Sequence, residues 1–278
     1  MPKVWFITGC STGFGRELAK VAAQKGDFVV GTLRKEAQVA DFEALVPGQI
    51  KGVLVDVTER SQIDAGVQVC VEAHGRVDVL VNNAGYGAMG AVEQVKADEM
   101  RWQFEVNVFG AVEMIQAVLP HMRTQKSGHI INITSIAGLR GTPGLGIYNG
   151  SKFALEGIGE ALARELKPFD IHVTNVEPGP FRTAWAGRSA NYTPLNIAGY
   201  ERSAGKIMDS LKERSGKQAG DPARAAHAMY ALTELDNPPV HLPLGAWAYK
   251  GARMKLQEMR EELDQYEYLG LPTDFPES

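Results

Sequence analysis

Short apolar runs alternate with longer stretches of helical spacing along most of the chain. The runs are rich in valine, isoleucine and aromatic residues, and they end at glycine or polar residues, as buried strands do. Because helical segments separate the runs, the pattern predicts an α/β chain with a doubly wound, mostly parallel seven-stranded sheet and helices on both faces. The seven strands are expected at residues 4–8, 27–33, 50–57, 77–81, 129–135, 171–176 and 240–244.

Capping residues and apolar stripes mark the helices between these strands. Thr58 resembles the N-cap of a helix over residues 59–74, and Gly75 fits its C-terminal stop. A long amphipathic helix begins at Asp98. Asn107 interrupts its apolar stripe, and such a residue is expected to be a buried, hydrogen-bonded amide.

The last third of the chain adds two helices and an edge strand. Asp221 caps a helix over residues 222–235, and Pro243 places the seventh strand at an edge of the sheet. Residues 254–268 form a charged helix, for which a solvated face and a subunit contact are equally good interpretations. No linker divides the 278 residues, so we expect a single domain whose C-terminal helix and tail occupy residues 249–278.

Composition and charge narrow the function. The net charge of −4 and the pI of about 5.9 give no support for nucleic-acid binding. No apolar run is long enough to span a membrane, and the first residues lead into a strand without a signal peptide. The two cysteines, Cys10 and Cys70, suit a reducing cytosol, so a cytoplasmic location is expected. His241 and the other histidines show no metal-ligand grouping, so no metal is expected.

A glycine-rich turn joins the first strand to the first helix. Gly9, Gly13 and Gly15 allow the backbone to turn tightly and approach a pyrophosphate, which the free amides at the helix start attract. The spacing is G-x-x-x-G-x-G and differs from the common dinucleotide fingerprint. A flexible connector is the alternative interpretation, but the strand, turn and helix in sequence favour a dinucleotide-binding Rossmann fold.

The second strand ends in two cations, Arg34 and Lys35, and in no acid. In a dinucleotide fold this end faces the adenosine ribose, where a carboxylate marks NAD and an arginine accommodates a 2′-phosphate. Ser11, in the glycine turn, is placed to donate to the same phosphate. The sequence therefore predicts NADP(H), with a solvated pair of charges after the strand as the alternative.

Tyr148 and Lys152 lie one helical turn apart on a single helix face. A phenol has an ordinary pKa of about 10, and a nearby ammonium lowers it. Such a pair can exchange a proton with a carbonyl or alcohol oxygen near neutral pH. Tyrosine and lysine at this spacing also occur by chance on surface helices, so the surroundings decide. Ser135 ends the fifth strand, at the edge where open parallel sheets bind ligands.

Several motifs resemble the short-chain dehydrogenase/reductase family when they are taken in order. They are Thr8-Gly9-x-x-x-Gly13-x-Gly15, Asn82-Asn83-Ala84-Gly85, Asn107, Ser135, Tyr148-x-x-x-Lys152 and Pro178-Gly179-x-x-x-Thr183. The resemblance covers roughly residues 3 to 250. Gly9-Cys10-Ser11 and Thr32-Leu33-Arg34 are most similar to the 17β-hydroxysteroid dehydrogenase type 1-like and retinol dehydrogenase branch.

The resemblance implies a role for each matching residue. Tyr148 is the general acid in reduction, Lys152 lowers its pKa and holds the nicotinamide ribose, and Ser135 bonds the substrate oxygen. Asn107 kinks its helix and holds a water that links Lys152 to solvent. Phe14 stands where the family usually has isoleucine or leucine, and it lends a backbone amide. The cofactor-binding residues implied are Gly9, Ser11, Thr12, Gly13, Phe14, Gly15, Arg34, Asp56, Val57, Asn83, Ala84, Gly85, Tyr148, Lys152, Pro178, Gly179, Phe181 and Thr183.

Residues 184–220 correspond to the family's substrate lid, and we call them the lid segment. Its apolar residues, which suit an apolar ketone or alcohol but also a plain helical hairpin, are Trp185, Tyr192, Tyr200, Met208 and Leu211. Met89 and Leu139 are further candidates for the substrate wall, but ordinary packing is the favoured interpretation of both.

The resemblance implies an NADP(H)-dependent enzyme that interconverts a carbonyl and a secondary alcohol on a small or medium apolar molecule. The alternatives are an NAD-linked alcohol dehydrogenase of the same family and a non-catalytic NADP(H)-binding regulator. A homodimer or homotetramer, paired through the two long helices, is implied as well.

Overall fold

The central sheet of the computed structural model has seven parallel strands in the order β3-β2-β1-β4-β6-β7-β9. The structure describes residues 1–185, 187 and 189–275. The strands of this sheet are β1 (Val4–Ile7), β2 (Phe28–Leu33), β3 (Ile50–Leu54), β4 (Val79–Asn82), β6 (Gly128–Ile133), β7 (Ile171–Pro178) and β9 (His241–Leu244). The strand order reverses between β1 and β4, which is where open sheets of this kind bind ligands.

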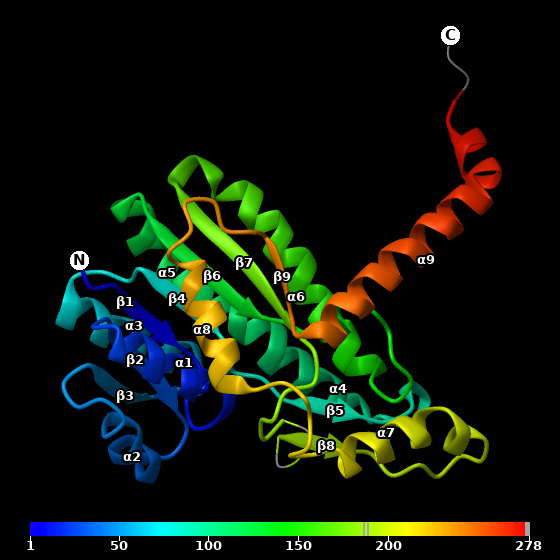
Figure 1. Cartoon of the computed structure of the whole chain (residues 1–278), viewed down its shortest axis with the longest axis horizontal. Helices are drawn as coiled ribbons and strands as arrows, with labels where there is room; N and C mark the ends of the chain where they lie inside the picture. The colour runs from blue at the N-terminus through cyan, green and yellow to red at the C-terminus, as the bar shows by residue number, and fades with distance from the viewer. Residues whose placement is uncertain (186, 188, 276–278) are drawn as a thin grey trace.

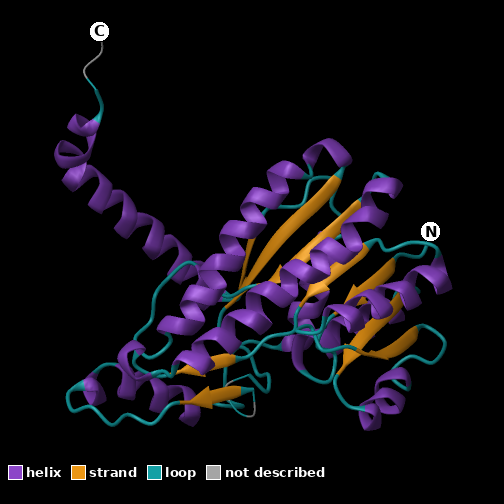
Figure 2. Cartoon of the chain, turned by 180° about the vertical axis from the view of Figure 1, so that it is seen from behind, coloured by secondary structure: helices purple, strands orange, loops and turns teal. Residues whose placement is uncertain are grey.

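Helices cover both faces of the sheet, as Figures 1 and 2 show from opposite sides. Residues of α1 and α8 share one hydrophobic cluster, and residues of α3, α5 and α6 share the other. The helices are α1 (Gly13–Gln24), α2 (Val39–Glu43), α3 (Arg60–His74), α4 (Ala97–Phe104), α5 (Gly110–Gln125), α6 (Gly146–Glu165), α7 (Ala204–Glu213), α8 (Pro222–Leu232) and α9 (Ala246–Gly270). The predicted doubly wound, parallel fold is confirmed.

The first strand shows why its sequence is apolar throughout. Trp5 and Ile7 belong to the cluster under α1 and α8, whereas Val4 and Phe6 belong to the cluster on the opposite face. Successive side chains of a strand point to opposite faces, so a strand covered on both faces buries every residue. All four of these side chains are buried.

A small second sheet was not predicted. β5 (Gly87–Met89) pairs in parallel with β8 (Ala190–Tyr192), and this pairing fastens the lid segment to the chain that follows β4. Strands of three residues are too short to carry a periodic signal. Residues 186 and 188 of the lid segment lie outside the described residues.

Several predicted helix boundaries are wrong. The helix expected from Asp98 onward is divided into α4, a π-helical turn over Glu105–Phe109 and α5. The N-cap of α3 is Glu59, because the Thr58 hydroxyl bonds the Asp56 carboxylate 2.9 Å away instead of a helix amide. Local sequence does not reveal such competition between partners.

At the end of the chain, α8 stops at Leu232, three residues before the predicted end. Its predicted cap is confirmed, since the Asp221 carboxylate accepts from the Ala223 amide at 2.9 Å. The last helix, α9, begins at Ala246 rather than at Met254. Within the described residues, no helix combines the length and the apolar composition needed to cross a bilayer.

Candidate active site

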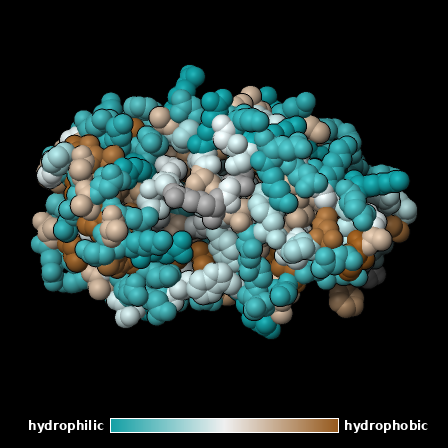
Figure 3. Space-filling view, turned by 90° about the horizontal axis from the view of Figure 1, so that it is seen from below, coloured by the Kyte–Doolittle hydropathy of each residue, from teal (hydrophilic) through white to brown (hydrophobic). Residues whose placement is uncertain are grey.

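A cleft of about 930 Å³ opens at the carboxyl ends of the strands. From that side the surface is mainly hydrophilic, with hydrophobic side chains showing between the polar ones (Figure 3). Gly15 and Asn107 lie behind residues that line the cleft. The other predicted site residues all line it: Gly9, Ser11, Thr12, Gly13, Phe14, Arg34, Asp56, Val57, Asn83, Ala84, Gly85, Ser135, Tyr148, Lys152, Pro178, Gly179, Phe181 and Thr183.

The glycine turn is built so that its backbone approaches other backbone closely. Gly9 has φ +71°, in the left-handed region that favours glycine. A Cβ at Gly9 would lie 3.0 Å from the Ala84 Cα, and one at Gly15 would lie 2.5 Å from the Asn83 amide nitrogen. Side chains at these two positions would collide with Asn83 and Ala84 and would push the turn away from the strand end.

Asn83 holds this turn in place. Its amide nitrogen donates to the carbonyl oxygens of Thr8 at 2.8 Å and Gly9 at 3.0 Å. In return, the Thr8 hydroxyl accepts from the backbone amides of Asn83 and Ala84, both at 2.9 Å. The amide group of Asn83 is therefore used within the protein, and only the remaining surface of this segment is open to a ribose.

At the other end of the cleft lie the two cations that follow β2. Arg34 and Lys35 are exposed on the cleft wall, and Ser11 lines the same region. Within the described ranges, the Arg34 guanidinium has no side-chain hydrogen bond or ion pair with another residue. It is consequently available to an anionic group bound in the cleft.

Tyr148 lies on α6 and is 5 % exposed. Burial raises the pKa of its phenol above the ordinary value, while a hydrogen bond with the Ser135 side chain acts in the opposite direction. Ser135 itself accepts from the Ala137 amide at 3.0 Å, which fixes the hydroxyl at the end of β6. Burial therefore has the larger effect on this phenol, and a lowering of its pKa by Lys152 stays a prediction.

Lys152 is buried one turn further along α6. Its ammonium donates to the Ile133 carbonyl oxygen at 2.8 Å and lies 5.9 Å from the centroid of the Tyr148 ring. Burial lowers the pKa of Lys152 to about 8, and the charge of Glu156 limits that fall. The side chain thus keeps its proton at neutral pH.

Asn107 occupies the π-helical turn between α4 and α5. Its carbonyl oxygen accepts from the Tyr86 amide at 3.1 Å, and its nitrogen donates to the Tyr86 carbonyl oxygen at 3.0 Å and the Ser151 hydroxyl at 3.3 Å. The predicted buried, bonded amide is found. These bonds fasten the chain after β4 to α6 and bring Gly85 close to Lys152.

Residues of the lid segment pack against the tyrosine. Trp185 packs against the Tyr148 ring with centroids 4.9 Å apart, and Ile207 and Leu211 of α7 pack beside it. Met89 is fully buried in a separate cluster under the lid segment, and Leu139 is not among the residues that line the cleft. Neither residue therefore belongs to the wall, and for Met89 the favoured interpretation, ordinary packing, is confirmed.

Some residues that line the cleft were missed. The charged ones are Arg140, Arg214 and Lys217, and Trp247 at the start of α9 is a large apolar one. An isolated basic residue in a loop or at a helix end looks like ordinary solvated surface, so sequence spacing gave no signal for these positions.

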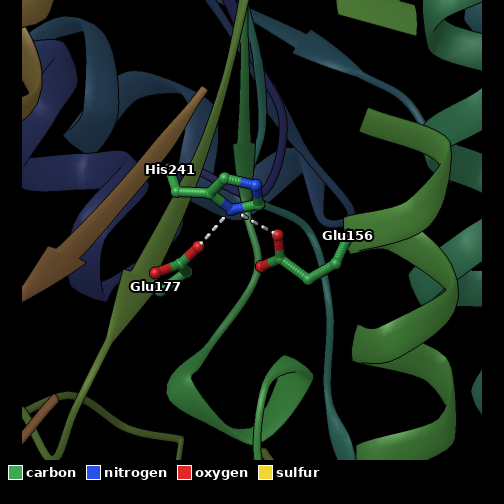
Figure 4. Close-up of side chains that lie close together, drawn as sticks. All are labelled: Glu156, Glu177 and His241. Atoms are coloured by element: carbon green, nitrogen blue, oxygen red, sulfur yellow. Dashed lines mark hydrogen bonds and ion pairs between the residues drawn. The ribbon is translucent and has the colours of Figure 1, made fainter. Parts of the chain in front are cut away.

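Three ionisable side chains gather beside the site, from α6, β7 and β9 (Figure 4). The His241 Nδ1 lies 2.7 Å from the Glu177 carboxylate and 3.4 Å from that of Glu156. Both glutamates are buried. The three offer ligand atoms within 4.8 Å of one another, a grouping that sequence spacing did not reveal. An imidazolium between two carboxylates already accounts for the contacts, and the absence of a metal stays a prediction.

These contacts change the titration of the cluster. Burial, followed by the charge of Glu156, raises the pKa of Glu177 to about 7. Burial acts to lower the pKa of His241, but its hydrogen bond and charge interaction with Glu177 raise it above the ordinary value of 6.5. Both pKa values are raised by folding. Because burial disfavours the ionised form, Glu177 costs stability as the pH rises through about 7, and the His241 imidazolium offsets part of that cost.

We expect His241→Gln to lower the free energy of unfolding, and to lower it more at pH 7 than at pH 5. At pH 7 the variant leaves two buried carboxylates without their cation, whereas at pH 5 the carboxylates take up protons. Losing one partner of a fully buried pair costs roughly 3–5 kcal/mol. His241 is 39 % exposed, so its loss is expected to cost less. Urea denaturation at both pH values measures the difference.

His227→Gln is the matched control, because His227 is exposed on α8. It should leave stability unchanged at both pH values. Equal destabilisation by the two variants, or a larger effect of His241→Gln at pH 5, would contradict the charge assignment.

Comparison with known proteins shows which family this chain resembles. The model of the short chain dehydrogenase family matches residues 3–192. The 3-ketodihydrosphingosine reductase of Bacteroides thetaiotaomicron is 38 % identical over 247 residues, which cover 88 % of each chain. Human retinol dehydrogenase 8 is 41 % identical over 192 residues, which cover 67 % of this chain and 61 % of that protein. The second similarity agrees with the predicted branch.

Solved structures of related enzymes support the same family. A short-chain dehydrogenase from Streptomyces avermitilis superimposes with a TM-score of 0.92 at 38 % identity, covering 99 % of this chain and 100 % of that one. A short chain dehydrogenase/reductase from Burkholderia phymatum, in complex with NAD, has a TM-score of 0.79 at 28 % identity. The match covers 100 % of this chain and 98 % of that one. ElxO with NADP bound has a TM-score of 0.72 at 26 % identity, and the match covers 87 % of this chain and 97 % of that one. With its glycine turn, its cleft and these relatives, the chain belongs to the short-chain dehydrogenase family.

Proposed function

We propose that this oxidoreductase uses NADP(H) to interconvert a carbonyl and a secondary alcohol on a small or medium apolar molecule. The observation that carries the proposal is the position of Tyr148 in the cleft. Its phenol is bonded to Ser135 on one side and covered by Trp185 on the other. Two hydroxyl groups therefore meet beneath an apolar cover, an arrangement that suits an apolar ketone and can stabilise the charge that develops on its oxygen.

The residues present fit a dinucleotide. Glycine at positions 9 and 15 lets the turn pack closely against Asn83 and Ala84, which keeps it in the compact form that a pyrophosphate-binding turn needs. Arg34 at the far end supplies a free cation for a 2′-phosphate. When bound, the nicotinamide supplies the hydride. Related structures hold either NAD or NADP, so the preference for NADP(H) rests on Arg34.

The chain's own residues would then handle the proton and the developing charge. Tyr148 gives its proton to the substrate oxygen in reduction and takes it back in oxidation. Ser135 donates a second hydrogen bond to the same oxygen, a contribution of about 3 kcal/mol by analogy with oxyanion holes. Lys152 holds the ribose with its charged ammonium, and Asn107 holds the water that connects Lys152 to solvent.

A panel of apolar ketones, tested with NADPH and in parallel with NADH, examines this proposal. Faster oxidation of NADPH than of NADH with at least one ketone is the expected result. A preference for NAD in alcohol oxidation would favour the NAD-linked dehydrogenase. Tight NADPH binding without turnover of any ketone or alcohol would favour a non-catalytic regulator.

The apolar cover makes a prediction about the substrate. Trp185→Ala should raise the KM for an apolar ketone roughly 10- to 100-fold, because it removes one large apolar contact worth about 1.5–3 kcal/mol. The KM for NADPH should change little. Phe169→Ala is the control, since Phe169 is exposed in the turn after α6 and does not line the cleft. An unchanged ketone KM in Trp185→Ala would contradict the assignment of the lid segment to the substrate.

We propose a cytoplasmic location and a homo-oligomer for this enzyme. Both cysteines are buried and free, which suits a reducing cytoplasm. A homodimer or homotetramer is what the family resemblance implies.

A further inference from the structure

The last helix leaves the body of the protein. α9 begins beside β9, where Ala248 and Gly251 are buried, and then projects outward (Figure 1). From Met259 to the end of the helix every residue is exposed. We call residues 252–270 the arm.

An isolated helix of this length is marginal in water. Helices shorter than about 12–15 residues rarely persist without tertiary packing. The outer half of the arm, from Met259 to Gly270, lies in that range and has no buried residue. Packing against a surface outside this body would supply what the arm lacks.

The arm carries an apolar stripe with the spacing of a coiled coil. Its positions alternate by four and three residues: Ala252, Leu256, Met259, Leu263 and Tyr266. Leu256 is 69 % exposed and Leu263 is 70 % exposed, values that are high for leucine in a folded protein. Such a stripe fits another helix of similar pattern.

Charges divide the arm into two halves. Basic residues dominate its first half, with Arg253, Lys255 and Arg260. Acidic residues dominate its second half, with Glu261, Glu262, Asp264 and Glu267. Two such helices in parallel place like charges side by side, whereas two in antiparallel place basic halves against acidic halves. The arm is thus complementary to a second copy of itself related by a two-fold axis.

We propose that two copies of this chain associate through their α9 helices, paired antiparallel along this stripe. Leu256 then faces Tyr266 of the partner subunit, and Met259 faces Leu263 of the partner subunit. The base of the arm adjoins the active-site cleft. Trp247 lines the cleft, and the Arg140 guanidinium of the cleft wall pairs with Glu258 at 3.2 Å. Pairing of the arms would therefore fix a helix that borders the substrate entrance.

Mass measurement of the full chain by light scattering tests the pairing. The wild type should associate, and Leu256→Glu with Leu263→Glu should halve the assembled mass. The matched control is Met254→Glu with Gln265→Glu, which adds the same charges on the opposite side of the helix and should keep the wild-type mass. A monomeric wild type, or an unchanged mass in the stripe variant, would overturn the proposal.

Cysteine cross-linking tests the orientation. Leu256→Cys with Tyr266→Cys should form a disulfide between subunits, whereas Leu256→Cys alone should not. Within one helix these positions lie about 15 Å apart, too far for a bridge inside one chain. Cys10 and Cys70 are buried and should not react. Cross-linking through Leu256→Cys alone would mean parallel pairing and overturn the proposal. So would a monomer that binds phosphatidylcholine–phosphatidylserine vesicles through the stripe.

Discussion

Tyr148→Phe is expected to lower kcat about 10⁴-fold or more while NADPH binding persists. The variant removes one hydroxyl and keeps the ring, whose centroid lies 4.9 Å from that of Trp185. The variant loses both the proton donor and the hydrogen bond to the developing oxyanion, and each contributes a factor of about 10²–10³ to the rate. Steady-state kinetics with a ketone gives kcat, and quenching of NADPH fluorescence gives the dissociation constant.

Tyr230→Phe is the matched control for this experiment. Tyr230 is also a buried tyrosine, but it stacks on Trp5 in the core at 5.6 Å, away from the cleft. Its loss of a hydroxyl should leave kcat near the wild-type value. Retained activity in Tyr148→Phe would mean that another group donates the proton.

Arg34→Asp is expected to shift the preference from NADPH towards NADH by roughly 10- to 100-fold in kcat/KM. A hydrogen bond to a charged group contributes about 1.5–3 kcal/mol, and the new carboxylate would repel a 2′-phosphate. The same carboxylate can accept from the ribose hydroxyls of NADH. The ratio of kcat/KM for the two cofactors, measured with one ketone, gives the shift.

Arg123→Asp serves as the control because it makes the same charge change at an exposed position of α5, outside the cleft. It should leave the cofactor ratio unaltered. If Arg34→Asp also leaves the ratio unaltered, Arg34 does not contact the cofactor.

The residues of the site were predictable where local spacing dictates geometry. Tyr148 and Lys152 are one turn apart in any helix, and a glycine turn between strand and helix has few other uses. Ser135 was placed correctly because the carboxyl ends of parallel strands share one edge. These predictions needed no knowledge of which elements become neighbours.

Other features depend on distant contacts and were missed for that reason. Asn83 bonds Thr8 across 75 positions, and His241 meets two glutamates carried by other elements. The raised pKa of Tyr148 arises from burial, to which Trp185 of the lid segment contributes by covering the ring. Spacing along the chain says nothing about such partners, and it therefore gave no sign of the effect of burial on that pKa.

Transfer of deuterium is the most direct test of the proposed chemistry. NADPH deuterated at C4 of the nicotinamide, on either face, is incubated with the enzyme and an apolar ketone that is turned over. Mass spectrometry should then find one deuterium on the carbinol carbon of the alcohol with one of the two labelled cofactors, and none when Tyr148→Phe replaces the wild type. An alcohol that carries no deuterium with either cofactor, or equal labelling by Tyr148→Phe, would contradict hydride transfer assisted by this tyrosine.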